Sequence, residues 1–176
     1  MYKKTKQYRL PNFDYSSNWC YFITIVCANR IPYLGSIANS EMTLSDIGEI
    51  VNQNIQNVSA FKDDVLIQKS VIMPNHIHLI IELKNESKSA EPPQSQSKYG
   101  HLSPLKKGSL GSFVNHFKGK ITRTCRENGL IDFKWQARFH DRIIRDEEEY
   151  NRIYYYIEHN VKNWERDKEH PLNNQK

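Results

Sequence analysis

His76 and His78 stand one residue apart, in the stretch MPNHIHLII, at the head of an otherwise apolar run. In an extended strand alternate side chains project from the same face, so both imidazoles point one way while Ile77 points the other way. Two neutral imidazoles on one face can hold one divalent cation if a further ligand comes from elsewhere in the chain. The alternative is a pair of half-exposed surface histidines, since histidine is intermediate in its burial. The pattern therefore indicates a candidate metal site whose remaining ligands lie elsewhere.

Three consecutive tyrosines supply candidate nucleophiles. On a helix, Tyr154 would lie at the edge of a buried stripe, Tyr155 in solvent, and Tyr156 on the other flank. A flank position suits a nucleophile because packing holds the ring while the hydroxyl stays accessible. Each tyrosine is followed four residues later by a possible metal ligand, respectively Glu158, His159 and Asn160. The helical position favours Tyr156, but spacing alone leaves the choice open.

Length and composition bound the class of protein. A chain of 176 residues suits one domain and can bury a core without metal or disulfide staples. Lys and Arg number 25 against 20 Asp and Glu, a mild basic bias that favours a polyanionic partner but also occurs in proteins without one. Cys20, Cys27 and Cys125 form no C-x-x-C pair, so we interpret them as reduced core thiols. No run approaches about 18 apolar residues, and we expect a soluble, cytoplasmic protein without a membrane partner.

The first elements that must position the histidines are a strand and a helix. Residues 19–27 are β-branched and aromatic, and they are apolar on both faces, as in a central strand. After a loop that contains Pro32 and Gly35, Ser45 or Asp46 can cap a helix that covers one face of the sheet. Its apolar residues at helical spacing are Ile47, Ile50, Val51, Ile55 and Val58.

The histidines themselves belong to a predicted hairpin. Residues 65–73 and 76–83 read as strands, and Pro74-Asn75 can turn the chain tightly between them. The following segment, 84–109, is rich in Ser, Pro, Gln and Lys and poor in residues that could pack. We interpret it as a mobile insertion within a single domain that spans residues 1–176.

Basic residues mark the next two predicted elements. The apolar pattern from Leu110 predicts a helix that stops at Asn128-Gly129 and carries Lys118, Lys120, Arg123 and Arg126 on its other face. Residues 135–145 read as a strand with Arg138, His140 and Arg142 on one side. Such faces could follow a phosphate backbone, or they could simply be solvated surface.

The tyrosines fall in the last predicted helix. Asp146 can cap it, with Glu149 as the reciprocal partner of a capping box. The apolar stripe along the helix consists of Tyr150, Ile153, Tyr154, Ile157, Val161 and Trp164. From about residue 165 the chain is a polar tail that we expect to fray.

Five short blocks carry a resemblance to a known family. They are YFITI from Tyr21, MPNHIHLI from Met73, FKGKITR from Phe117, WQARFHD from Trp135 with Ile144-Arg145 shortly after, and YIEHN from Tyr156. In their order and spacing, from about residue 19 to residue 164, they resemble the REP-associated tyrosine transposases, which are single-tyrosine HUH transposases.

The resemblance implies an α+β fold of the ferredoxin-like, HUH endonuclease type, with a central antiparallel sheet and helices packed on it. His76 and His78 would be the HUH pair, and Tyr156 the nucleophile. Asn160 would be the third ligand to Mg²⁺ or Mn²⁺. The family commonly follows this Asn with Pro, whereas this chain has Val161.

The implied activity is the cleavage and rejoining of single-stranded DNA at hairpin-associated sites, through a 5′-phosphotyrosine and a free 3′-hydroxyl. Because a phenolate is a fair leaving group, the phosphotyrosyl bond can be resealed. The residues that we expect to contact the DNA are Lys118, Arg123, Arg138, His140 and Arg142. Cleaving two ends with a single tyrosine needs two turnovers or two protomers, so a homodimer is one of two alternatives.

Two alternatives to a transposase stay open at this point. One is a module that binds single-stranded or hairpin nucleic acid but no longer cuts it. The other is a metal-dependent phosphoesterase of a different fold that uses only the His-x-His pair. Its product would not remain attached to the protein, whereas a transposase would leave a covalent adduct.

Overall fold

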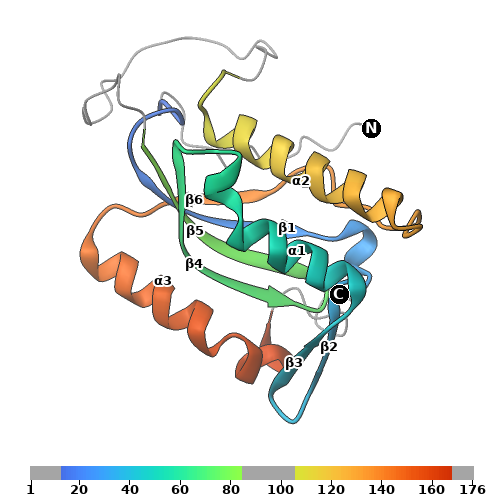
Figure 1. Ribbon diagram of the computed structural model, residues 1–176. Helices are drawn as coiled ribbons and strands as arrows, with labels where there is room; N and C mark the ends of the chain where they lie inside the picture. The colour runs from blue at the N-terminus through green and yellow to red at the C-terminus, as the bar shows by residue number, and fades with distance from the viewer. Residues whose placement is uncertain (1–12, 85–105, 168–176) are drawn as a thin grey trace, which may run out of the picture.

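A four-stranded antiparallel sheet with helices on both faces forms the centre of the computed structural model, which describes residues 13–84 and 106–167 (Figure 1). Its strands are β1 (Cys20–Val26), β4 (Val65–Met73), β5 (His76–Leu83) and β6 (His140–Ile143), in the order β4-β5-β1-β6. The helices are α1 (Asp46–Gln56), α2 (Leu110–Glu127) and α3 (Glu147–His159), with short 3-10 helices at η1 (Ala28–Arg30), η2 (Val58–Ala60) and η3 (Val161–Arg166). The predicted α+β class is confirmed.

Two expectations fall largely outside the described residues. Most of the predicted mobile insertion at 84–109 lies there, and so does the predicted polar tail from about residue 165, apart from residues 165–167. Glu165 and Arg166 belong to η3 and Asp167 is buried, so the expected fraying is wrong for these three residues. In the described part of the insertion, Ser109 begins α2: its side chain accepts a hydrogen bond from the N–H of Ser112. No helix of the described residues is both long and apolar enough to span a membrane.

β1 and β5 are the two central strands, and they run antiparallel. Each is paired along both edges and covered on both faces, which accounts for the apolar residues on both sides of each strand. Their register places His76 opposite Val26 and His78 opposite Thr24. β4 joins β5 through the tight turn at Pro74-Asn75, as predicted. The histidines therefore begin a buried strand.

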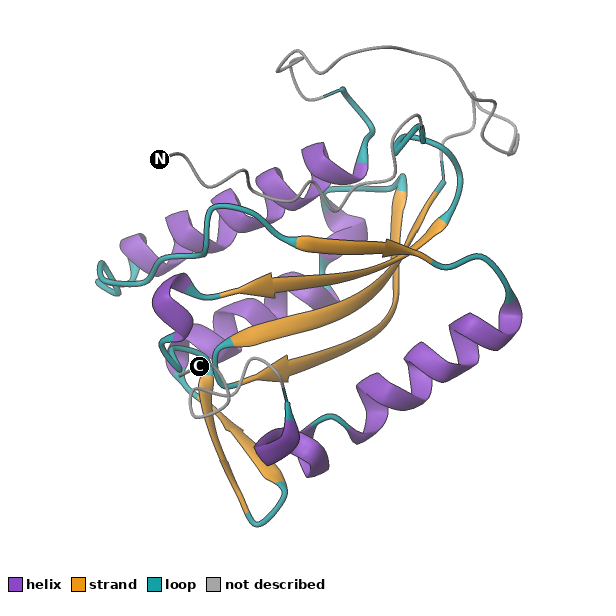
Figure 2. Cartoon of the chain, turned by 180° about the vertical axis from the view of Figure 1, so that it is seen from behind, coloured by secondary structure: helices purple, strands orange, loops and turns teal. Residues whose placement is uncertain are grey.

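The two faces of the sheet carry different helices. α1 and α2 lie on one face, whereas α3 lies on the other (Figures 1 and 2). The larger core, with Phe117 of α2, fills the first face, and a smaller cluster with Ile80 and Ile157 lies beneath α3. His78 stacks on Phe22, which packs against the smaller cluster, with ring centroids 5.2 Å apart. The imidazoles consequently point to the α3 side of the sheet.

Local sequence signals explain where the helices begin and end. The side chains of Ser45, Ser109 and Asp146 each accept a hydrogen bond from the backbone N–H three residues later. Gly129, after the end of α2, has φ 78°, a left-handed conformation that glycine adopts without steric cost. Of the two candidate caps Ser45 and Asp46, Ser45 is the N-cap, and the predicted cap at Asp146 and the predicted stop at Asn128-Gly129 are confirmed.

The three cysteines are free thiols in or near the core, as predicted. Cys27 and Cys125 are buried, Cys20 is partly buried, and all three are free thiols. Burial raises the pKa of each thiol, which keeps the sulfur protonated and unreactive at neutral pH.

The predicted strand over residues 135–145 is wrong in extent. Only His140–Ile143 pair with β1, and Trp135 makes a single bridge to Cys27 before the chain bends away at exposed Ala137 and Arg138. The carbonyl of Gln136, which a longer ladder would use, instead accepts a hydrogen bond from the Lys118 ammonium. A tertiary contact therefore interrupts the strand.

Two further elements differ from prediction. The loop expected before residue 45 contains a hairpin of β2 (Gly35–Ala38) and β3 (Glu41–Leu44), and its turn residues Asn39 and Ser40 both have positive φ. That conformation matches a two-residue hairpin turn, although the strands are only four residues long. The last helix ends at His159 rather than at Trp164, and the chain continues as η3.

Candidate metal and tyrosine site

The two histidines form a buried pair. His76 is 0% exposed and His78 is 1% exposed, so the alternative of half-exposed surface histidines is wrong. Their Nε2 atoms lie 3.0 Å apart. Two buried imidazoles with converging ring nitrogens are arranged as expected for two ligands of one metal ion.

The hydrogen bonds on the far side of each ring orient these nitrogens. Asn75 donates from Nδ2 to the carbonyl of Arg30 at 3.1 Å, so its Oδ1 is the atom that lies 2.8 Å from His76 Nδ1. The Nδ1–H of His76 therefore donates, which leaves the lone pair of Nε2 available. On the neighbouring ring, Thr24 Oγ1 lies 2.9 Å from His78 Nδ1. Asn75 and Thr24, both buried, thus support the pair from behind.

Tyr156 is the tyrosine that reaches the pair. Its hydroxyl lies 3.3 Å from His78 Nε2, and it donates a hydrogen bond to Asp167 Oδ2 at 3.2 Å. The ring stands edge-on to Phe22, with centroids 6.1 Å apart, and is 39% exposed. The helical flank predicted for this residue explains both properties, because packing holds one edge of the ring while the other faces solvent.

The other two tyrosines are engaged elsewhere. The ring of Tyr154 packs against the smaller core, and the Lys69 ammonium lies 4.1 Å from its centroid. Tyr155 is 64% exposed and stacks on His159, with centroids 3.9 Å apart. Of the three hydroxyls, therefore, that of Tyr156 is the one bonded within the histidine cluster.

Asn160 follows Tyr156 by one helical turn and is 2% exposed. Its side-chain Oδ1 is buried and has no hydrogen-bond partner among the described residues. An orphaned buried amide oxygen is costly unless water or an ion satisfies it, and amide oxygens are ligands for hard divalent cations. The assignment of Asn160 as a third ligand stays a prediction, and its unpartnered oxygen supports it.

Asp167 is the site residue that sequence reasoning missed. It is 7% exposed, and one ligand atom from each of His76, His78 and Asp167 falls within a cluster no wider than 4.8 Å. The N–H of Asp167 bonds to the carbonyl of Trp164 at the end of η3, and the Trp164 ring lies 6.0 Å from that of His76. Trp164 is the last apolar residue of the stripe, and its packing holds the chain next to the histidines. This position of Trp164 was the signal in the sequence that could have pointed to Asp167.

The donor set of His76, His78 and Asp167 is compatible with a divalent metal ion. Imidazole nitrogen suits transition metals, and carboxylate oxygen suits Mg²⁺ and Mn²⁺. The residues therefore fit the metal that the resemblance implies.

Comparison with known proteins shows the family and the fold of the chain. No model of a known protein family matches the chain. An uncharacterized protein of Haemophilus influenzae Rd is 40% identical over 161 residues, which cover 90% of this chain and 89% of that protein. The chain belongs to the same family as that protein. A solved REP-associated tyrosine transposase bound to a REP hairpin has a TM-score of 0.59 at 22% identity, covering 91% of this chain and 74% of its own.

The chain has the fold of the REP-associated tyrosine transposases. The resemblance seen in the five sequence blocks is thus confirmed at the level of the fold. Within this fold, the histidines come from a central strand and the tyrosine from the helix that packs over it, so the sheet and α3 together build the site.

The structure divides the residues that were expected to contact DNA between two surfaces. Lys118 and Arg123 belong to α2, on the sheet face opposite the histidines. His140 pairs with Thr24 of β1, whose side chain contacts His78, so His140 shares the histidine face. Arg138 is exposed just before β6.

Arg142 also lies on the histidine face of β6, but it already has a partner. Its guanidinium forms an ion pair with Glu149, which is buried at the start of α3. Glu149 also accepts a hydrogen bond from the backbone N–H of Arg145 at 3.0 Å. In a capping box the acceptor would bond to the N–H of the N-cap, Asp146, which is one residue later. This arginine therefore helps to dock α3 on the sheet.

Proposed function

We propose that this protein is a metal-dependent, single-stranded DNA endonuclease and strand transferase of the transposase type. The observation that carries the proposal is the Tyr156 hydroxyl, 3.3 Å from a buried histidine pair whose nitrogens converge. A nucleophile next to a set of metal ligands is the minimum that phosphodiester cleavage requires.

Four residues would hold the metal ion, Mn²⁺ or Mg²⁺: His76, His78 and Asp167, with the amide oxygen of Asn160. The ion would draw charge from the non-bridging oxygens of the scissile phosphate as negative charge develops there. Asn75 holds the His76 ring in the tautomer that presents Nε2.

Tyr156 would attack phosphorus, so that a bond from its oxygen to phosphorus forms while the bond from phosphorus to the 3′-oxygen breaks. The phenolic proton passes to Asp167, whose Oδ2 already accepts its hydrogen bond, and the departing 3′-oxygen takes a proton from water. The products are a 5′-phosphotyrosine and a free 3′-hydroxyl. Attack by a 3′-hydroxyl on the same bond reverses the reaction and joins a new strand.

The substrate we propose is DNA with a hairpin and an adjoining single strand. The solved transposase of this fold is bound to a REP hairpin, which supports a hairpin ligand. Arg138 and His140, beside the histidine face, would contact the strand that enters the site. Because the site contains one reactive tyrosine, the exchange of two ends would take two turnovers or two protomers.

The test is adduct formation on a labelled hairpin oligonucleotide with a single-stranded extension. With Mn²⁺, the wild-type protein should give a labelled protein band on a denaturing gel, and Tyr156→Phe should give none while it still folds and binds the hairpin. Tyr155→Phe, the exposed neighbour, is the matched control and should retain the adduct.

Two outcomes would reject the proposal. Cleavage without any adduct would favour a phosphoesterase, and hairpin binding without cleavage under all metal conditions would favour a binding module. An adduct that survives in Tyr156→Phe would move the nucleophile to another residue, and peptide mapping of the adduct would name it.

A further inference from the structure

The ring of Phe22 lies against both the proposed ligand His78 and the proposed nucleophile Tyr156. It stacks on His78 with centroids 5.2 Å apart and an angle of 30° between the ring planes, and it stands edge-on to Tyr156 at 6.1 Å and 88°. The His78 and Tyr156 rings are themselves 5.4 Å apart. Each of the three rings therefore contacts the other two, and Phe22 is the one that carries no polar atom.

The hydrogen bonds of the Tyr156 hydroxyl are too long to fix the ring by themselves. They measure 3.3 Å to His78 Nε2 and 3.2 Å to Asp167 Oδ2, whereas hydroxyl bonds to oxygen in proteins are most often about 2.7–2.8 Å long. The ring is also 39% exposed, so one side of it is open to solvent. Among the described residues, the rings that contact Tyr156 are those of Phe22 and His78. Packing against these two rings must therefore supply much of its orientation.

The two rings beside Tyr156 differ in what else holds them. Phe22 belongs to the central strand β1, opposite Ile80 of β5, and packs against the smaller core. Its ring is therefore placed by the sheet rather than by α3. His78 keeps a second contact with β1, because Thr24 Oγ1 lies 2.9 Å from its Nδ1. Loss of the Phe22 ring would thus leave His78 anchored through Thr24 but would remove an apolar contact between Tyr156 and the sheet.

We propose that Phe22 is a positioning residue, which holds the Tyr156 hydroxyl beside the histidine pair. The inference rests on the proposed function, because it takes Tyr156 as the nucleophile. A ring without polar atoms takes no part in forming or breaking bonds, so Phe22 acts on the fraction of molecules in which the hydroxyl is in place. One aromatic pair changes such an equilibrium by about two- to twelve-fold. The rate of the tyrosyl step should therefore depend on Phe22 more than the affinity for metal or DNA does.

The first test needs neither metal nor DNA. Protein labelled with meta-fluorotyrosine is studied by fluorine NMR in EDTA, and the spectra of Tyr156→Phe and Tyr155→Phe identify the resonances of these two residues. In Phe22→Leu the Tyr156 resonance should move toward that of Tyr155, whose ring is 64% exposed, because it loses the ring current of Phe22 and gains contact with water. An unchanged Tyr156 resonance would overturn the proposal.

Tyr150→Leu is the matched control for Phe22→Leu. Tyr150 lies on α3 and packs against the same smaller core, but its ring contact is with Tyr154, 6.2 Å away, rather than with the histidines. Each change replaces one ring of this cluster by leucine, so each should lower the Tm. Tyr150→Leu should nevertheless leave the Tyr156 resonance in place. Equal shifts in the two variants would count against Phe22, because they would show a general loosening of α3.

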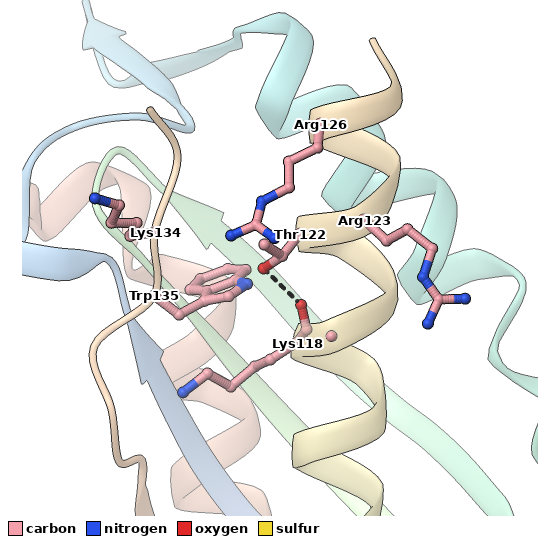
Figure 3. Close-up of a pocket in the computed structure, with 7 residues that line it drawn as sticks. Lys118, Thr122, Arg123, Arg126, Lys134 and Trp135 are labelled. Atoms are coloured by element: carbon pink, nitrogen blue, oxygen red, sulfur yellow. Dashed lines mark hydrogen bonds between the residues drawn. The ribbon is translucent and has the colours of Figure 1, made fainter. Parts of the chain in front are cut away.

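The second test separates rate from affinity, with labelled hairpin and Mn²⁺ at saturation in a single turnover. Phe22→Leu should form the adduct about ten-fold more slowly, and Tyr150→Leu should stay within about two-fold of the wild-type rate. Lys118 and Arg123, two residues expected to contact DNA, line a hollow on α2, on the opposite face of the sheet (Figure 3). Phe22→Leu should therefore bind the hairpin within about two-fold of wild type. Its Kd for Mn²⁺, measured by calorimetry, should rise by no more than about three-fold.

Two kinetic results would reject the positioning role. One is a wild-type rate in Phe22→Leu, and the other is a slower rate that higher concentrations of hairpin and Mn²⁺ restore. Failure of the proposed function gives a different result. If the wild-type protein forms no adduct, the proposed function fails, whereas the fluorine spectra in EDTA still decide whether Phe22 holds Tyr156.

Discussion

Replacement of Asn75 tests whether the buried histidines are a metal site. This residue is 0% exposed, and its Oδ1 accepts a hydrogen bond from the Nδ1–H of His76 at 2.8 Å. Asn75→Ala removes this acceptor, which favours the Nδ1–H tautomer, so the ring can more readily rotate or present Nε2–H to the site. Asn75→Asp is the matched variant: both changes remove the amide N–H that bonds to the Arg30 carbonyl, but only alanine removes the oxygen that His76 requires.

The expected magnitude follows from the position of Asn75 behind the ligand. Loss of such a partner typically weakens metal affinity by about 10- to 100-fold, or about 1.4–2.7 kcal/mol. At a Mn²⁺ concentration of about 100 times the wild-type Kd, binding stabilises the native state by about 2.7 kcal/mol. With a Kd about 30-fold weaker, the same concentration would stabilise Asn75→Ala by only about 0.9 kcal/mol.

Isothermal titration calorimetry with Mn²⁺ would measure the Kd, and thermal unfolding with and without Mn²⁺ would measure the stabilisation. Asn75→Asp should remain within a few-fold of wild type, because a carboxylate also accepts from Nδ1–H. Both variants are expected to lose some stability without metal, since both leave the Arg30 carbonyl without its amide donor. If folded Asn75→Ala binds Mn²⁺ as tightly as wild type, the histidines are not ligands held by this hydrogen bond.

Two further predictions concern the ligands themselves. His78→Ala should abolish Mn²⁺-dependent cleavage of a labelled hairpin while hairpin affinity stays within a few-fold, because phosphate contacts elsewhere supply most of the affinity; undiminished cutting on a denaturing gel would contradict the assignment. Asp167→Asn retains an acceptor for the Tyr156 hydroxyl but removes a charged ligand, so Mn²⁺ affinity measured by calorimetry should fall about ten-fold. An unchanged affinity would reduce Asp167 to a hydrogen-bond partner of the tyrosine.

Features that depend on near neighbours in the chain could be predicted from the sequence. Alternation along a strand places His76 and His78 on one face whatever the fold, because backbone geometry imposes a period of two. Side-chain caps at Ser45 and Asp146 act within three residues, so they mark helix starts without knowledge of the fold. The flank position of Tyr156 likewise follows from helical periodicity.

Which groups meet across the fold could be seen only once the strands and helices were packed together. The side chain of Asp167 belongs to a stretch that reads as polar tail, yet packing of Trp164 near His76 brings its carboxylate to the site. The basic face of α2 and the tyrosine of α3 lie on opposite sides of the sheet, which no local pattern specifies. Such contacts depend on the order in which strands pair and on the face that each helix covers, and these are set by burial summed over the whole core rather than by adjacent residues.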